Sequence, residues 1–376
     1  MRAAISLFSG ALGLDLGLER AGIDIVLRQD VDPQCCSTME ANGRPVYCGD
    51  IRNISASDLL ARAKLDKGTP FLVCGEPPCQ PFSTAGKRMG INDPRGSLFA
   101  DFVRIVDHIR PRFFIFENVK GIVSSSVNPG GRPGSVLEVI LGEFRKIGYM
   151  TVHGLLDAVE YGTPQFRERL VIIGTRDAED IFLPVPTHFE RHQQADMRWR
   201  TLRQAIADIE DAPGLCAQFS SERLEFLKMV PEGGNWKSLP EHLLRKAMGG
   251  AYASGGGKVG FYRRLDYAQP SPTLVTSPVQ KATMMCHPSK NRPLSVKEYA
   301  RIQQFPDTWI FEGTTADQYR QIGNAVPVGL AFAVGSSVIA AAEGNSLVKT
   351  KRNRGTSAHR FLEIVVNEKN ALTLKA

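Results

Sequence analysis

A cysteine in a proline-rich turn is the strongest candidate for a nucleophile in this chain. Cys79 follows the apolar run 71–75, and Pro77, Pro78 and Pro81 surround it. Prolines restrict the backbone, and the carboxyl ends of parallel strands are where reactive groups are displayed. A thiolate held there can attack an electrophilic carbon. The other cysteines are scattered without a Cys-x-x-Cys pair, so we interpret them as small buried residues and expect neither a zinc site nor a disulfide framework.

A second candidate is an acid that directly follows an apolar run. Glu117 comes after Phe-Phe-Ile-Phe at 113–116 and precedes Asn118. Burial of a carboxyl group raises its pKa and keeps it available as a proton donor. The alternative is a glutamate that only caps the next helix.

Two arginines share one face of an extended segment. Gln165, Arg167 and Arg169 alternate just before the apolar run 170–175, and alternate residues of a strand point the same way. Two guanidinium groups aimed together suit a carbonyl or phosphate target. The alternative is an edge strand with solvated charges.

A glycine turn follows the first apolar run. Residues 8–15 read Phe-Ser-Gly-Ala-Leu-Gly-Leu-Asp, which does not match the Gly-x-Gly-x-x-Gly pyrophosphate fingerprint. Asp30 ends the second run, where it can accept ribose hydroxyls, and Asp50 ends the third, where it can accept an adenine amino group. Together they indicate a nucleoside cofactor without a diphosphate. The alternative is a turn that only packs a helix on a strand.

Strands and helices must alternate to position these groups. We expect strands at the apolar runs 3–8, 23–29, 46–51, 71–78, 113–119 and 170–175. We expect helices over 14–22, 33–42, 97–109, 135–147, 294–304 and 328–342. This order predicts an α/β domain with a mainly parallel sheet. Ser295 and Glu298 form a capping box at the start of the fifth helix.

Composition limits the class of protein. The 376 residues are 43% hydrophobic and 23% charged, with a net charge of +7, which is typical of a globular protein with room for two domains. No apolar run reaches about 18 residues and no signal peptide is evident, so we expect a cytoplasmic protein with no membrane contact. The residues after 344 are rich in Lys and Arg, which suits a nucleic-acid partner without requiring one.

These motifs, in this order, resemble the DNA (cytosine-5) methyltransferase family over nearly the whole chain. Phe8–Leu14 is similar to its S-adenosylmethionine loop, Pro78-Cys79-Gln80 to its nucleophile loop, and Glu117-Asn118-Val119 to its base-recognition strand. Gln165-x-Arg167-x-Arg169 resembles the paired-arginine motif, 292–306 a late structural helix, and 321–327 the closing cofactor motif. One departure is Val31, where many members carry a larger apolar or aromatic residue.

The resemblance implies a Rossmann-like S-adenosylmethionine-dependent methyltransferase sheet with a smaller, irregular target-recognition domain. The expected divisions are a catalytic domain at 1–184, a recognition domain at 185–305, a return to the catalytic domain at 306–344 and a basic tail at 345–376. The reaction implied is methyl transfer to carbon 5 of a flipped-out cytosine, with S-adenosylhomocysteine as the second product and no metal.

The resemblance also implies residue roles. The catalytic set is Cys79, Glu117, Arg167 and Arg169. The cofactor set is Phe8, Ser9, Gly10, Gly13, Leu14, Asp30, Val31, Asp50, Ile51, Pro78, Leu98, Asn324 and Val326. The base-contacting set is Pro78, Ser83, Asn118, Gln165 and Thr273. The expected DNA contacts are Lys87, Arg88, Arg95, Lys258, Tyr262, Arg263 and Arg264.

The expected partner is double-stranded DNA, and we expect the protein to bind it as a monomer. A cognate restriction endonuclease is expected as a functional partner that does not contact this protein. Two alternatives stay open: a tRNA cytosine-5 methyltransferase, and a catalytically silent DNA-binding regulator with the same fold. An NAD-dependent oxidoreductase is a poorer match, because it would lack its glycine fingerprint.

Overall fold

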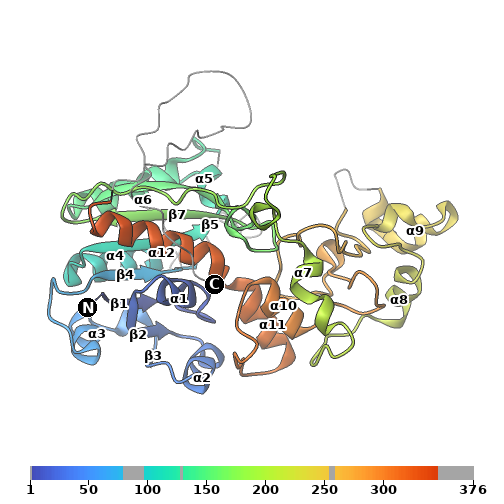
Figure 1. Ribbon diagram of the computed structural model, residues 1–376, viewed down its shortest axis with the longest axis horizontal. Coiled ribbons are helices and arrows are strands. Elements are labelled where there is room, and N and C mark those ends of the chain that lie inside the picture. The colour runs from blue at the N-terminus through green and yellow to red at the C-terminus, as the bar shows by residue number, and fades with distance from the viewer. Residues whose placement is uncertain (1, 79–96, 128–129, 254–258, 346–376) are drawn as a thin grey trace.

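The computed structural model describes residues 2–78, 97–127, 130–253 and 259–345. Within them a seven-stranded sheet forms the core of one half of the molecule (Figure 1), with the strand order β3-β2-β1-β4-β5-β7-β6. The strands are β1 (Ala3–Leu7), β2 (Asp24–Asp30), β3 (Val46–Cys48), β4 (Leu72–Gly75), β5 (Phe113–Val119), β6 (Met150–Asp157) and β7 (Glu168–Thr175).

The first five strands are parallel, and β7 runs antiparallel to both β5 and β6. The strand order reverses between β1 and β4. Ligands of open α/β sheets bind at the carboxyl ends of the strands beside such a reversal. The predicted α/β class with a mainly parallel sheet is therefore confirmed.

One strand was not expected from the sequence. β6 lies at the sheet edge and pairs only with β7. Most of its residues are exposed or half-buried, because an edge strand covers little core. Its sequence, Met-Thr-Val-His-Gly-Leu-Leu-Asp, consequently lacks the continuous apolar run that marks the buried strands.

Helices cover both faces of the sheet. The α-helices of this part are α1 (Gly13–Arg20), α2 (Pro33–Ala41), α3 (Ala56–Ala63), α4 (Ser97–Ile109), α5 (Gly121–Ser124), α6 (Ser135–Lys146) and α12 (Val328–Ala342). Side chains of α3, α4 and α6 form one core with the sheet, and those of α1 and α12 form the other.

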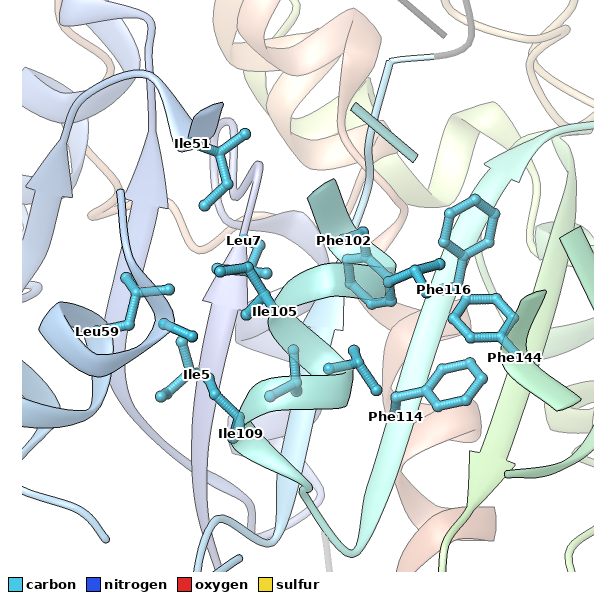
Figure 2. Packing of buried hydrophobic residues seen from close by; sticks show 14 of the residues in the cluster. Ile5, Leu7, Ile51, Leu59, Phe102, Ile105, Ile109, Phe114, Phe116 and Phe144 are labelled. Carbon is cyan, nitrogen blue, oxygen red and sulfur yellow. The ribbon is translucent and has the colours of Figure 1, made fainter. Parts of the chain in front are cut away.

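An aromatic cluster supports the end of β5. Phe114 and Phe116 of β5 pack against Phe102 of α4 and Phe144 of α6 (Figure 2), and the Phe114 and Phe144 rings stack with centroids 4.1 Å apart. These side chains are almost fully buried. Close-packed rings allow little displacement, so they fix the strand from which Glu117 projects.

Helices α1 and α12 approach closely because α1 carries glycines at the contact. A Cβ on Gly17 would lie 2.3 Å from Ala331 Cβ and 2.5 Å from the Val328 carbonyl oxygen. A Cβ on Gly13 would lie 2.1 Å from the Val326 carbonyl oxygen. A larger residue at either position would push α12 and the residues just before it away from α1.

By length and hydropathy alone, the helical segment Thr315–Ala342 could cross a membrane. However, 67% of its apolar window is buried inside the protein, and α12 packs on α1 and the sheet. The core helix of a water-soluble domain meets the same test.

Residues 202–324 supply the remaining helices: α7 (Leu202–Ile206), α8 (Ser221–Leu227), α9 (Glu241–Met248), α10 (Val296–Ile302) and α11 (Thr315–Asn324). One core joins α7, α10 and α11 to Ala11 beside the first turn, and a second core surrounds α8 and α9. In Figure 1, α8 and α9 lie farthest from the sheet. The predicted capping box is present, with Ser295 and Glu298 bonding each other's backbone amides.

Candidate active site

The ends of β1, β2 and β3 meet in one hydrogen-bonded group. The Gly10 amide donates to Asp30 Oδ2 at 2.8 Å, and the Ser9 amide donates to the Gln29 carbonyl oxygen at 3.1 Å. The Gln29 side chain in turn donates to the Gly49 carbonyl oxygen at 2.6 Å. The glycine turn is thus held against the two strands that carry Asp30 and Asp50.

The backbone of this turn is unusual. Phe8 and Leu12 have φ values of 54° and 72°, although neither is a glycine. Gly10 has φ +52°, and a Cβ built on it would meet nothing within 4 Å. Left-handed non-glycine residues cost free energy and cluster at functional sites. Open space beside Gly10 lets a ligand reach the backbone.

Asp30 and Asp50 have different surroundings. Burial raises the pKa of Asp30, although its carboxylate accepts hydrogen bonds from the Asp32 and Gly10 amides. Hydrogen bonds from Arg52 lower the pKa of Asp50. Val31, directly after Asp30, is 61% exposed and offers an apolar surface at the same edge. A nucleoside could therefore meet two half-buried acids and an aliphatic face.

A buried charge network under the glycine turn was missed from the sequence. Arg28 lies 3.1 Å from Asp15 (Nε to Oδ2), and both side chains are 1% exposed. The Ser6 hydroxyl donates to Asp15 Oδ1, and the Ser9 hydroxyl donates to Ser6. The network ties the turn to β1, β2 and α1. Arg28 interrupts the apolar run 23–29, and this basic residue could have indicated a buried ion pair.

The remaining cofactor candidates surround the same edge. Leu14, Ile51 and Val326 are buried, Leu98 is partly buried against the sheet, and Asn324 is exposed. The carbonyl of Val326 lies against Gly13, so the closing motif reaches the first turn.

Glu117 and Arg169 form an ion pair at the end of β5. Arg169 Nε lies 2.8 Å from Glu117 Oε1, and their side chains are 12% and 8% exposed. Burial raises the pKa of Glu117, while the charges of Arg169 and Arg167 oppose that rise. Within the described part of the chain, the Nη2 group of Arg169 has no hydrogen-bond acceptor. The pair can therefore present a carboxyl group and a guanidinium donor to one ligand.

Arg167 is less accessible to a ligand than Arg169 is. This corrects the expectation that Arg167 assists Arg169 in binding a ligand. Its side chain is fully buried, and its guanidinium donates to the carbonyl oxygens of Leu274, Gly323 and Asn324 at 2.7–3.1 Å. Arg167 instead joins β7 to two distant segments.

The predicted base contacts are also engaged within the fold. Gln165 is buried between Gln303 and the Leu274 amide. Thr273 donates its hydroxyl to the Phe166 carbonyl oxygen. Asn118 donates to the Pro77 carbonyl oxygen at 2.9 Å, which ties the turn after β4 to β5.

Pro78 is exposed and is the last described residue before the predicted nucleophile. Cys79, Ser83, Lys87, Arg88, Arg95 and Lys258 lie outside the described residues. Because β4 pairs with β5 up to Gly75 and Phe116, the chain enters the predicted nucleophile loop beside Glu117.

Two of the expected DNA contacts are buried. Arg264 is 5% exposed, and its guanidinium bonds six acceptors, which include the Val230, Leu227 and Lys290 carbonyl oxygens. Tyr262 is also 5% exposed. Arg263 donates to the Met284 carbonyl oxygen. Tyr262 and Arg264 therefore contribute to the interior of this region, and Arg264 cannot read a base edge in this arrangement.

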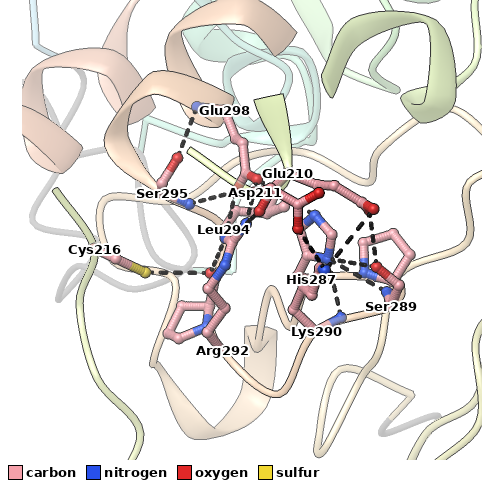
Figure 3. A network of polar contacts seen from close by, with 12 residues as sticks. Glu210, Asp211, Cys216, His287, Ser289, Lys290, Arg292, Leu294, Ser295 and Glu298 are labelled. Carbon is pink, nitrogen blue, oxygen red and sulfur yellow. Dashed lines mark hydrogen bonds and ion pairs between the residues drawn. The ribbon is translucent and has the colours of Figure 1, made fainter. Parts of the chain in front are cut away.

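A polar network at the start of α10 links separate segments (Figure 3). Arg292 binds both oxygens of Glu298 at 2.7 and 2.8 Å, and His287 lies 3.3 Å from Glu298. Burial opposes ionisation of Glu298, but the hydrogen bonds from Arg292 and His287 lower its pKa to about 2. Arg292 also donates to the Glu210 carbonyl oxygen. The network fixes the 207–211 turn and the 286–293 loop on α10.

Two cysteines differ from the expectation of free, buried thiols. Cys36 of α2 and Cys48 of β3 form a disulfide with Cα atoms 5.8 Å apart, and Cys48 is exposed. β3 pairs with β2 so that Cys48 lies beside Asp30, and α2 begins just after Asp30. The fold thus joins residues that no sequence spacing marked. Among the described residues, no cluster suitable for a metal ion was found.

Comparison with known proteins bears on the chemistry of this site. The family model described as C-5 cytosine-specific DNA methylase matches residues 3–340. The chain is 39% identical to type II methyltransferase M.Eco47II of Escherichia coli, over 89% of this chain and 78% of that protein. It is 41% identical to type II methyltransferase M.Sau96I of Staphylococcus aureus, over 88% and 74%.

Solved structures share the fold. A putative DNA modification methyltransferase encoded within an Escherichia coli prophage matches with a TM-score of 0.66 and 23% identity, over 91% of this chain and 100% of that one. A mutant of Spodoptera frugiperda DNMT2 matches with a TM-score of 0.59 and 18% identity, over 90% and 100%.

Proposed function

This chain belongs to the C-5 cytosine-specific DNA methylase family, and from that premise we propose that it methylates carbon 5 of a flipped-out cytosine through a covalent bond between Cys79 and carbon 6. It is a DNA cytosine-5 methyltransferase of the type II, restriction-modification kind. The observation that carries the proposed mechanism is the buried Glu117–Arg169 pair beside the entry to the Cys79 loop.

The residues at the ends of β1, β2 and β3 fit S-adenosylmethionine. Gly10 leaves room for backbone contact, Asp30 is a half-buried acceptor for ribose hydroxyls, and exposed Val31 offers an apolar face to adenine. Asp50 stands at the same edge and suits the adenine amino group. When bound, S-adenosylmethionine supplies an electrophilic methyl group and leaves as S-adenosylhomocysteine.

The side chains activate an otherwise poor carbon nucleophile. The Cys79 thiolate adds to carbon 6 of cytosine, which breaks the aromatic ring and makes carbon 5 electron-rich. Glu117 holds the N3 edge and the exocyclic amine, and Arg169 donates to the O2 carbonyl, where negative charge develops. After methylation, loss of the carbon-5 proton and expulsion of Cys79 restore the ring.

A base inside a duplex cannot reach such a site, so the target cytosine must leave the helix. We propose that residues 185–305 contribute to target choice, with Lys87, Arg88, Arg95 and Lys258 near DNA phosphates. The buried Arg264 is omitted from this set. We further propose that the enzyme acts as a cytoplasmic monomer, without membrane contact, alongside a restriction endonuclease of the same sequence specificity.

A fluorinated substrate tests the covalent step. Duplex DNA with 5-fluorocytosine at the target should trap a protein–DNA adduct that survives denaturation, because fluorine cannot leave carbon 5 as a proton does. The target itself comes first from bisulfite sequencing of DNA from cells that express the protein. Normal methylation of cytosine with no adduct on the fluorinated duplex would refute the covalent route.

Replacement of Asp30 tests the cofactor site. Asp30→Ala should weaken S-adenosylmethionine binding roughly 10- to 100-fold, because it removes charged hydrogen bonds to the ligand and the anchor of Gly10. Isothermal titration calorimetry measures the change. Asp24→Ala, at the exposed opposite end of β2, is the matched control and should bind normally. Equal affinity of the two variants would remove Asp30 from the site.

A tRNA cytosine-5 methyltransferase is the alternative that the sequence left open. The relatives of about 40% identity named as type II methyltransferases favour DNA. Methyl incorporation into duplex DNA and into tRNA, measured side by side, separates the two substrates.

A further inference from the structure

A second carboxyl group lies next to Glu117 and has no role in the mechanism above. β4 and β5 are parallel neighbours, paired up to Gly75 and Phe116, and each continues by one residue to a glutamate, Glu76 and Glu117. Adjacent strands of a sheet lie about 4.8 Å apart. The two acids therefore occupy neighbouring positions at the same edge of the sheet, and Glu76 stands three residues before Cys79.

The surroundings of Glu76 do not favour its ionised form. Burial raises its pKa well above the usual range, and the negative charges of Glu117 and Asp15 raise it further, while Arg169 and Arg167 act in the opposite direction. Within the part of the chain that the structure describes, no hydrogen bond to the Glu76 side chain is found.

The nearby positive charges are already committed. Asp15 is paired with Arg28, Arg167 donates to three backbone carbonyl oxygens, and Arg169 pairs with Glu117. Among the described residues, Arg169 is thus the arginine that forms an ion pair with one of the two neighbouring carboxyl groups, and the charge of Arg167 also favours their ionised forms. Two carboxyl groups that share such a site retain one proton between them and titrate as a pair.

We propose that Glu76 is a positioning residue that holds one proton in common with Glu117, so that the base site offers a proton to N3 of cytosine when Cys79 adds to carbon 6. This inference rests on the proposed function. Glu117 contacts the base, and Glu76 acts through Glu117.

The proton balance closes over one catalytic cycle. The sulfur electron pair forms the bond to carbon 6, the ring electrons shift toward N3, and N3 takes the proton from Glu117, which leaves both carboxyl groups ionised beside Arg169. After methylation, the carbon-5 proton leaves to water and the sulfur–carbon bond breaks. The electron pair returns to sulfur, and the N3 proton returns to the glutamate pair, which is ready for the next base.

The test measures the rate of adduct formation on 5-fluorocytosine DNA as a function of pH. In Glu76→Gln the amide cannot hold the shared proton, so Glu117 ionises at lower pH than the pair does. The fall in rate at alkaline pH should begin about one pH unit or more lower than in wild type. At a fixed pH in that falling part of the profile, the rate should be about tenfold lower. At low pH the rate should stay within about twofold of wild type. Glu76→Asp, which keeps an acid, should restore the alkaline limb.

Glu143→Gln, which replaces an exposed carboxylate on α6, is the matched control and should follow the wild-type profile. A Glu76→Gln profile that falls equally at every pH, or that matches wild type, overturns the proposal. If that variant fails to fold, infrared spectra of the wild-type protein labelled with carbon-13 glutamate test instead whether a glutamate carboxyl group is protonated. A protonated carboxyl band at neutral pH supports the shared proton, and its absence overturns it. Failure of wild type to form any adduct would instead refute the proposed function.

Discussion

Cys79→Ser is expected to lose methyl transfer by roughly 10³-fold or more while it keeps its affinity for S-adenosylmethionine. A serine hydroxyl is almost entirely protonated at neutral pH, whereas a thiol is readily converted to the nucleophilic thiolate. Apart from Pro78 and Leu98, the cofactor candidates come from the ends of β1, β2 and β3 and from the closing motif, so the substitution leaves these residues unchanged. The variant should therefore bind cofactor and DNA and stop before the covalent step.

Transfer of a tritiated methyl group to target DNA, with calorimetric binding of the cofactor, separates the two effects. Cys216→Ser is the matched control, because Cys216 is half-buried, lies outside the predicted site, and contacts the Pro293 carbonyl oxygen, Tyr319 and Arg292, to which a hydroxyl can also bond. That variant should transfer methyl groups within about twofold of wild type. Undiminished turnover of Cys79→Ser would show that sulfur is not the nucleophile.

Many of the buried strands and helices could be predicted from the sequence, but α3 and α11 were missed. Continuous apolar runs marked β1, β4 and β5, and the apolar segment 328–342 coincides with α12. β6 was missed because an exposed edge strand needs no such run. Shallow burial explains the failure to predict β6 but not the failure to predict α3 and α11, because Leu59 of α3 and Ile322 of α11 are fully buried.

Site residues could be predicted where a short sequence motif contains them. They were harder to predict where their role depends on contacts with distant parts of the chain. Glu117 and Arg169, which were both assigned to the catalytic set, lie 2.8 Å apart. By contrast, Arg167 and Arg264 looked like ligand contacts but bind backbone carbonyl oxygens in the interior. Every residue has a carbonyl, so the sequence cannot indicate which of them accepts from an arginine.

Glu76 and the Cys36–Cys48 disulfide were missed for a related reason. Glu76 becomes notable only because β4 pairs with β5 and places it beside Glu117. Cys36 and Cys48 meet only because β3 pairs with β2. Strand order is a property of the whole sheet, and a short spacing pattern does not contain it.

Arg167→Met should lower the free energy of unfolding by roughly 3 to 4 kcal/mol, the second large effect that we expect. The substitution keeps an unbranched side chain but leaves the carbonyl oxygens of Leu274, Gly323 and Asn324 without their charged donor in a buried place. Arg167→Lys should recover only part of the loss, since an ammonium group lacks the planar fork that spans separate acceptors. Urea unfolding measures both variants.

Arg132→Met is the control for loss of an arginine, because the Arg132 side chain is 70% exposed and pairs with Glu138 at the surface. It should change the free energy of unfolding by about 0.5 kcal/mol or less. If Arg167→Met were equally mild, the three carbonyl contacts would contribute little to stability. If it is severe, cofactor affinity should fall with it, because Asn324 leads directly to Val326, whose carbonyl packs on Gly13. The paired arginines then divide their work: Arg169 faces the base, and Arg167 holds the closing segment against the glycine turn.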